Sequence, residues 1–198
     1  MSRPAPHLSV VPGAAPLAAR TDDELMALAA SGVVDAFGAL VARYESRVRG
    51  YCAKLCGSRS IGDEIAQECF LRLWRVRLSY APRGQFKAYL FIMVENRCRN
   101  ENRGRWRRRE VSSVAMDEEP GACDQHEQLL IAQRHAAVQR GLERLPEAQR
   151  RAIVLRFTAG LEYDEIAAIV GRSAPTVRTR VFHGIARLRA ILTRGDAR

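Results

Sequence analysis

The apolar residues of this chain recur at spacings of three and four along most of its length. That spacing places them on one face of an α-helix, and no stretch alternates apolar and polar residues as a half-buried strand does. We therefore predict an all-α protein. The predicted helices cover residues 22–31, 37–56, 61–77, 86–105 and 129–145, with three shorter ones between residues 146 and 192.

The clearest local signal is a helix-turn-helix within residues 161–189. Ile166 and Ile169 give its first helix an apolar face, and Gly171 is able to adopt the left-handed conformation that ends a helix. Val177 and Val181 begin an apolar stripe on the second helix. The pattern predicts two helices joined by a tight turn.

The second helix also predicts an unusual outward face. Phe182 falls on the polar side, together with Thr179 and His183, and Arg178 lies beside them. A helix in the DNA major groove uses an aromatic ring against thymine methyl groups and arginines against guanine. A structural helical hairpin with a solvated basic face is the alternative.

The charge distribution divides the chain into four parts. Residues 1–20 contain four prolines and predict a disordered tail. Residues 21–109 carry 17 Lys and Arg against 10 Asp and Glu, and residues 128–194 form a second basic helical domain. Between them, residues 110–127 have six acidic and no basic side chains and predict a linker. We hypothesise that this linker masks the basic domains, the alternative being a simple spacer.

The fourth predicted helix ends in a segment typical of nucleic-acid contact. Seven arginines lie between Arg97 and Arg109, and the net charge of the whole chain is +10. Guanidinium groups bind phosphate, and an interleaved aromatic ring stacks on bases. The interpretation rests on residues that share this segment: Asn96, Arg97, Asn100, Arg103 and Trp106.

Nothing in the sequence indicates catalysis, a metal or a cofactor. The five cysteines lack a paired CxxC arrangement, so Cys52 and Cys56, four residues apart, are interpreted as buried thiols. No Gly-rich phosphate loop or nucleophile triad appears. Because the cysteines indicate no disulfide framework, we expect a reducing, cytoplasmic location. No apolar run reaches about 20 residues, so we expect no membrane insertion.

Four motifs in order resemble the extracytoplasmic-function (ECF) sigma factors of bacterial RNA polymerase. They are AFGALVARYESRV, EIAQECFLRLWR, GQFKAYLFIMVENRCRN and LERLPEAQRRAIVLRFTAGLEYDEIAAIVGRSAPTVRTRV. The resemblance covers residues 22–192. It implies a non-enzymatic, promoter-recognising subunit with sigma region 2 at residues 21–109 and sigma region 4 at residues 128–194.

The resemblance also implies partners and site residues. The partners are core RNA polymerase, through the clamp helices of its largest subunit and the flap of its second-largest subunit, promoter DNA and an anti-sigma factor. Polymerase-binding residues would be Glu64, Gln67 and Glu68. The minus-ten element would be read by Tyr80, Phe86, Asn96, Arg97, Asn100, Arg103 and Trp106. The minus-thirty-five element would be read by Arg156, Arg178, Thr179, Phe182 and His183.

The sequence differs from the family pattern at two positions, and two other functions remain as alternatives. Pro175 falls later than the proline of the family's Pro-x-Gly-Thr-Val motif, and His183 stands where relatives often have Arg, so the upstream sequence preference does not transfer. The runner-up is a stand-alone helix-turn-helix repressor or activator, which would dimerise on palindromic sites. An arginine-rich RNA-binding adaptor is a third class.

Overall fold

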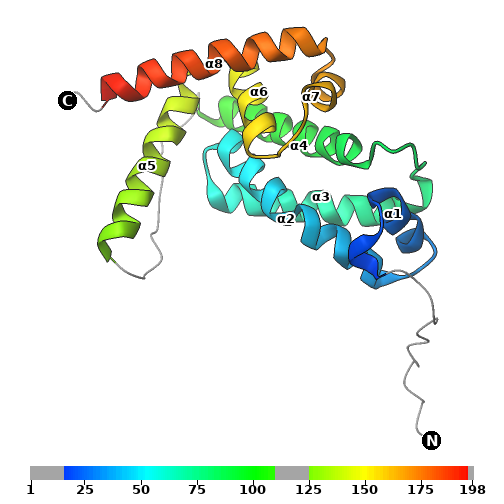
Figure 1. Cartoon of the computed structure of the whole chain (residues 1–198). Helices are drawn as coiled ribbons and strands as arrows, with labels where there is room; N and C mark the ends of the chain where they lie inside the picture. The colour runs from blue at the N-terminus through cyan, green and yellow to red at the C-terminus, as the bar shows by residue number, and fades with distance from the viewer. Residues whose placement is uncertain (1–15, 110–124, 196–198) are drawn as a thin grey trace, which may run out of the picture.

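The computed structural model describes residues 16–109 and 125–195, and the side chains of residues 16–104 and 133–194. Within those ranges every regular element is helical, as Figure 1 shows and as predicted. The α-helices are α1 (Asp22–Ala30), α2 (Val34–Cys56), α3 (Arg59–Val76), α4 (Phe86–Arg109), α5 (Gln125–Glu143), α6 (Glu147–Phe157), α7 (Tyr163–Val170) and α8 (Ala174–Gly195). Two short 3-10 turns, Leu17–Ala19 and Arg77–Ser79, precede α1 and follow α3.

Helices α1 to α4 form the first body. Thr21 and Glu24 make the predicted capping box at the start of α1, where the Glu24 carboxylate accepts the Thr21 backbone N–H at 2.8 Å. α2 and α3 lie so close that a Cβ built on Gly62 would come within 2.6 Å of the Ala53 backbone nitrogen. Only glycine allows this crossing, which brings the apolar stripes of both helices into one core.

Helices α5 to α8 form the second body and contain the helix-turn-helix. Gly171 ends α7 with a φ of 63°, the left-handed conformation that its position predicts. Val177 and Val181 of α8 are buried, as predicted. A Cβ on Gly184 would lie 2.7 Å from the Ile153 side chain, so this glycine lets α8 approach α6.

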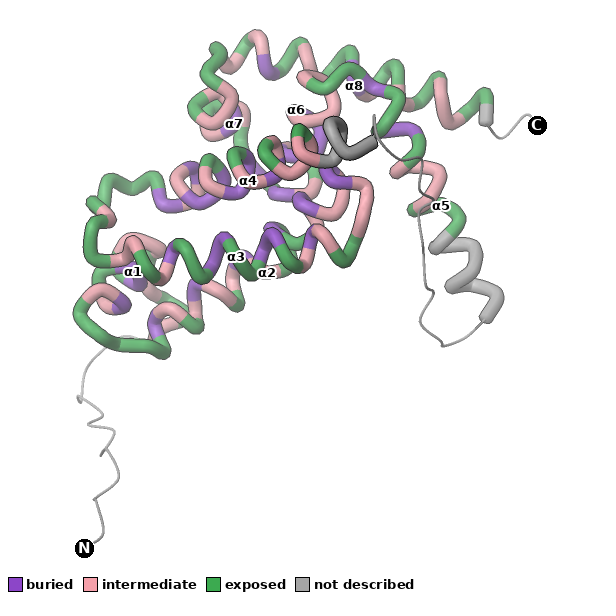
Figure 2. Tube along the Cα trace, turned by 180° about the vertical axis from the view of Figure 1, so that it is seen from behind, coloured by how far each residue is buried: buried purple, intermediate pink, exposed green. Residues whose placement is uncertain are grey.

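The two bodies lie against each other and share a single hydrophobic core (Figure 2). α6 contacts α2, and α7 contacts α4. The Lys87 ammonium on α4 donates to the Gly160 carbonyl and to Glu165 of α7, both at 3.0 Å. Sequence periodicity predicted two helical domains but not this contact, because periodicity identifies an apolar face without identifying its partner.

Part of the predicted disordered tail is ordered, which corrects that boundary. In the 16–20 segment, the Arg43 guanidinium donates to the carbonyls of Ala18 and Arg20 at 3.2 and 3.1 Å. These bonds satisfy backbone groups that a solvated tail would leave to water. The predicted linker at 110–127 lies mostly outside the described residues, and α5 begins at Gln125.

Candidate nucleic-acid interface

The outer face of α8 carries four of the residues predicted to read the upstream, minus-thirty-five element. Arg178, Thr179, Phe182 and His183 are all exposed. The Phe182 ring is 69% exposed and touches the His183 ring edge-on at a centroid distance of 5.5 Å. The helical spacing thus places an apolar ring in solvent among polar groups, as the sequence predicted.

Arg156 joins this face from the end of α6. Its guanidinium donates to the Leu161 carbonyl at 2.9 Å and to the Glu162 carboxylate at 2.8 Å. The hydrogen bond to Glu162 is the main cause that raises the pKa of Arg156. Arg156 is therefore a fixed positive charge beside the start of α7.

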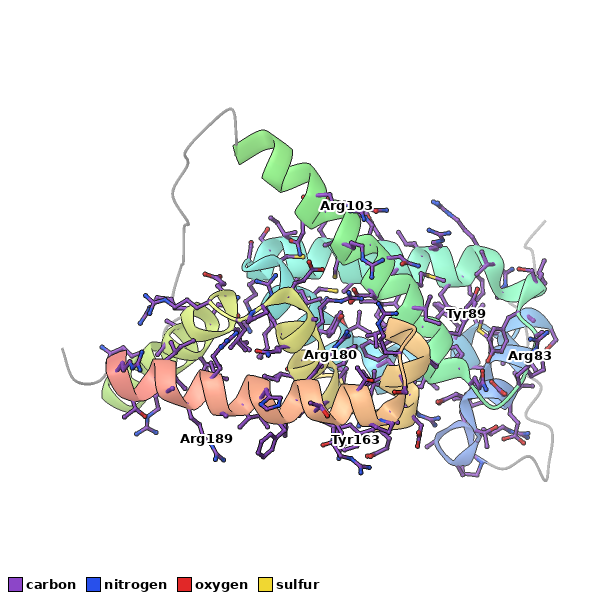
Figure 3. The ribbon with its side chains drawn as sticks, turned by 90° about the horizontal axis from the view of Figure 1, so that it is seen from above. Arg83, Tyr89, Arg103, Tyr163, Arg180 and Arg189 are labelled. Carbon is purple, nitrogen blue, oxygen red and sulfur yellow. The ribbon has the colours of Figure 1, made fainter. Side chains whose placement is uncertain are left out.

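Tyr163, the first residue of α7, connects Arg156 with Arg178. The guanidinium carbon of Arg156 lies 5.2 Å from the Tyr163 ring centroid, and that of Arg178 lies 5.1 Å from it. Figure 3 shows Tyr163 beside the amino-terminal part of α8. Tyr163 was not predicted from the sequence, where the available signal was an aromatic ring at the first position of the first helix of a helix-turn-helix.

The described part of the arginine-rich helix presents a polar face. Asn96, Asn100 and Arg103 follow one another at spacings of four and three along α4, and all three are exposed. Trp106 lies on the part of α4 whose side chains are outside the described residues. Amides and a guanidinium on one face suit phosphate and base contacts.

The predicted contact of Phe86 with the minus-ten element is wrong. Phe86 is only 2% exposed and lies against Tyr44, at a ring centroid distance of 5.6 Å. A ring buried in this core cannot stack on a base. Phe86 instead supports Tyr80, whose ring lies 5.8 Å away and is half-buried.

Asp23 of α1 fixes this loop and was not found from the sequence. The Tyr80 hydroxyl donates to the Asp23 carboxylate at 2.5 Å, and the Gly84 backbone N–H donates to the same carboxylate. Burial, followed by the hydrogen bond to Asp23, raises the pKa of Tyr80. Asp23 therefore holds both ends of the loop, and Tyr80 stays neutral.

Glu64, Gln67 and Glu68 form an exposed face on α3. Glu68 also binds Arg97, with its carboxylate oxygen 2.5 Å from the Arg97 Nε. This hydrogen bond is the main cause that raises the pKa of Arg97. Glu68, which was predicted to bind polymerase, therefore forms an ion pair with Arg97, which was predicted to read the minus-ten element.

Comparison with known proteins identifies the family. The sequence matches the models for Sigma-70 region 2 over residues 40–108 and Sigma-70, region 4 over residues 135–188. It is 32% identical over 171 residues to the ECF RNA polymerase sigma-E factor of Escherichia coli strain K12, covering 82% of this chain and 89% of that protein. The chain belongs to the ECF sigma factors.

Solved structures agree with the fold of this sigma factor. CnrH in complex with the cytosolic domain of CnrY superposes with a TM-score of 0.67 and 27% identity, over 87% of this chain and 97% of that one. The sigma factor RpoE from Bartonella quintana, solved with the anti-sigma factor NepR, gives a TM-score of 0.62 and 24% identity over 79% of this chain and 96% of that one. The family assignment does not favour the alternative prediction, a stand-alone helix-turn-helix repressor or activator.

A buried charge cluster joins the two bodies of the sigma factor. Glu95 of α4 is 3% exposed, accepts a hydrogen bond from the Tyr51 hydroxyl and forms an ion pair with Arg151 of α6. Arg99 lies 3.4 Å from the same carboxylate. Its sequence neighbours gave no sign that Glu95 is buried, since they include exposed polar residues.

Four of the cysteines lie in the core as thiols. Cys52 and Cys56 are buried together with Cys98, which the structure adds from α4. Among the side chains that the structure describes, those of residues 16–104 and 133–194, no cluster is arranged to hold a metal ion. Within residues 16–109 and 125–195 no helix has the length and hydropathy to span a membrane.

Proposed function

We propose that this ECF sigma factor binds core RNA polymerase through α3 and reads promoter DNA through α4 and α8. The observation that carries the DNA assignment is the 69% exposure of Phe182 on the outer face of α8. Exposing a phenylalanine ring to water is unfavourable unless the ring has a partner. Thymine methyl groups in the major groove are such a partner, and Arg178 beside the ring suits guanine or phosphate.

The charge of α3 supports a protein partner for that face. Glu64 and Glu68 are acidic, and DNA phosphate would repel them. A basic protein surface would attract them and set the orientation of docking. We assign this face to the clamp helices of the polymerase's largest subunit and the second body to the flap of the second-largest subunit.

The mechanism is selective binding rather than catalysis. The polymerase supplies the chemistry of RNA synthesis, and the sigma factor selects the start point and opens the duplex. Unstacking costs a few kcal/mol per base step, which phosphate contacts and a fitted pocket offset. Asn96, Asn100 and Arg103 would contribute these contacts, with Tyr80 at the melted strand.

Two further assignments belong to the proposal. An anti-sigma factor is a partner, since one structure with this fold was solved with such a protein. The cytoplasm is the location, since the polymerase acts there.

Transcription in vitro tests the proposal. Purified sigma factor added to core polymerase should direct initiation from a subset of sites in a genomic DNA library. Glu64→Lys should abolish assembly with the core enzyme, as measured by size-exclusion chromatography. Glu64 is preferable to Glu68 for this test because reversing Glu68 would also release Arg97.

The control is Asp35→Lys, the same charge reversal at an exposed position in the first turn of α2. It should retain assembly with the core enzyme. Thermal denaturation of both variants checks that they are folded. Initiation absent with the wild-type protein, together with dimeric binding to palindromic DNA, would support the stand-alone regulator instead.

A further inference from the structure

Tyr163 lies at the edge of the hydrophobic core, between two arginines. It is the first residue of α7, is only partly exposed and packs against the core with part of its ring. Its ring is flanked by Arg156 from the end of α6 and Arg178 from the start of α8. Three helices thus converge on one aromatic ring.

The backbone of Tyr163 is held firmly. Glu162 and Glu165 form a reciprocal capping box around it, in which the Glu162 backbone N–H donates to Glu165 at 2.7 Å. Glu165 also accepts from Lys87 of α4 at 3.0 Å. The capping box fixes the backbone, and packing against the hydrophobic core gives the ring a defined position before any DNA is present.

Each guanidinium gains from this fixed ring. Both guanidinium carbons lie within about 6 Å of the Tyr163 centroid, the range in which a cation is attracted to an aromatic face. Arginine has many rotamers, and ordering such a side chain on binding costs affinity. The ring holds Arg178 and, together with the hydrogen bonds to Leu161 and Glu162, Arg156, which lowers that cost for both side chains.

We propose that Tyr163 is a positioning residue for upstream promoter recognition, acting through Arg156 and Arg178. The ring sets the spacing and direction of the two guanidiniums, so that both engage the same stretch of DNA. This inference rests on the proposed function of α8. It assigns to Tyr163 no direct contact with a base.

Two substitutions separate positioning from direct contact. Tyr163→Phe keeps the aromatic face and removes the hydroxyl, whereas Tyr163→Leu removes the aromatic face. The probe is a duplex selected from a random-sequence pool by the full-length wild-type protein, and affinity is measured by fluorescence anisotropy. We expect Tyr163→Phe to bind within about twofold of wild type and Tyr163→Leu to bind about fivefold to tenfold more weakly.

The salt dependence supplies a readout that a purely structural role would not move. If Tyr163→Leu releases one arginine from phosphate, the slope of log affinity against log salt should decrease by about one unit. In a double-mutant cycle, Tyr163→Leu should cost less on an Arg178→Ala background than in the wild type. Thermal denaturation should show equal melting temperatures for the Phe and Leu variants.

Three results would overturn the inference. Equal losses in the Phe and Leu variants would show that the hydroxyl, which also interacts with Arg156, and not the aromatic face is needed for binding. Wild-type affinity in Tyr163→Leu would show that the arginines need no support. A loss that tracks the melting temperature would make Tyr163 a folding residue. Wild-type protein that enriches no duplex from the pool and does not support transcription would instead refute the proposed function.

Discussion

The buried ion pair between Glu95 and Arg151 offers the sharpest test of how the two bodies are joined. Replacing Arg151 by methionine removes the charge and keeps most of the side-chain stem. Glu95 would then retain the Tyr51 hydroxyl and the Arg99 guanidinium, of which the second is 38% exposed. We expect the contact between α4 and α6 to open in the variant before the first body unfolds.

The expected magnitude follows from burial. Breaking a fully buried pair by removing one partner costs about 3–5 kcal/mol. Arg151 is 16% exposed, Arg99 remains, and separation of the bodies would let water reach Glu95. We therefore expect a loss of about 1–3 kcal/mol, or roughly 2–12 °C in melting temperature for a chain of this size.

Hydrogen exchange locates this loss. Amides of α6 and α7 should exchange faster in Arg151→Met, while those of α2 and α3 keep their protection. Arg150→Met, a change at the adjacent position for which the structure gives no ion pair, should leave exchange unchanged. The double variant Glu95→Gln with Arg151→Met should recover at least half of the lost stability, since a pair removed together leaves no buried charge.

Unchanged exchange in α6 and α7 in the Arg151→Met variant would refute this reasoning. It would show that the shared apolar core alone holds the bodies together. Equal acceleration in all helices would also contradict it, because the pair would then stabilise the entire fold.

Three further predictions follow from single features of the molecule. Phe182→Ala should weaken binding to the upstream element by about 1–3 kcal/mol with an unchanged melting temperature; a parallel loss of stability would make the ring a core residue. Burial and the nearby Glu95 raise the pKa of Tyr51 well above its usual 10.0, so the free energy of unfolding should fall as the pH rises above about 10, and a urea titration giving equal stability at pH 8 and 11 would contradict this. Neutralising the acidic side chains of residues 110–127 should make the free protein bind DNA more tightly at low salt, and this gain should disappear at high salt. Equal DNA affinity of the neutralised and wild-type proteins at low salt would show that the linker is a simple spacer.

The sequence by itself determined the helices and their faces. The spacing of Val177 and Val181 was sufficient to place Phe182 in solvent, because a helix fixes the direction of neighbouring side chains. The Thr21 capping box and the Gly171 helix end are equally local, since their partners lie within a few residues. For the same reason the exposed faces of α3 and α4 were predicted well.

Only the tertiary structure decided which groups meet across those faces. Phe86 was assigned to DNA from the family resemblance of its segment, but it is buried because α2 supplies Tyr44. Tyr51 and Glu95 lie 44 positions apart, and Lys87 and Glu165 lie 78 apart, so no local period relates them. Contacts of this kind depend on how two apolar faces dock, and the arrangement of arginines around Tyr163 depends on that docking as well.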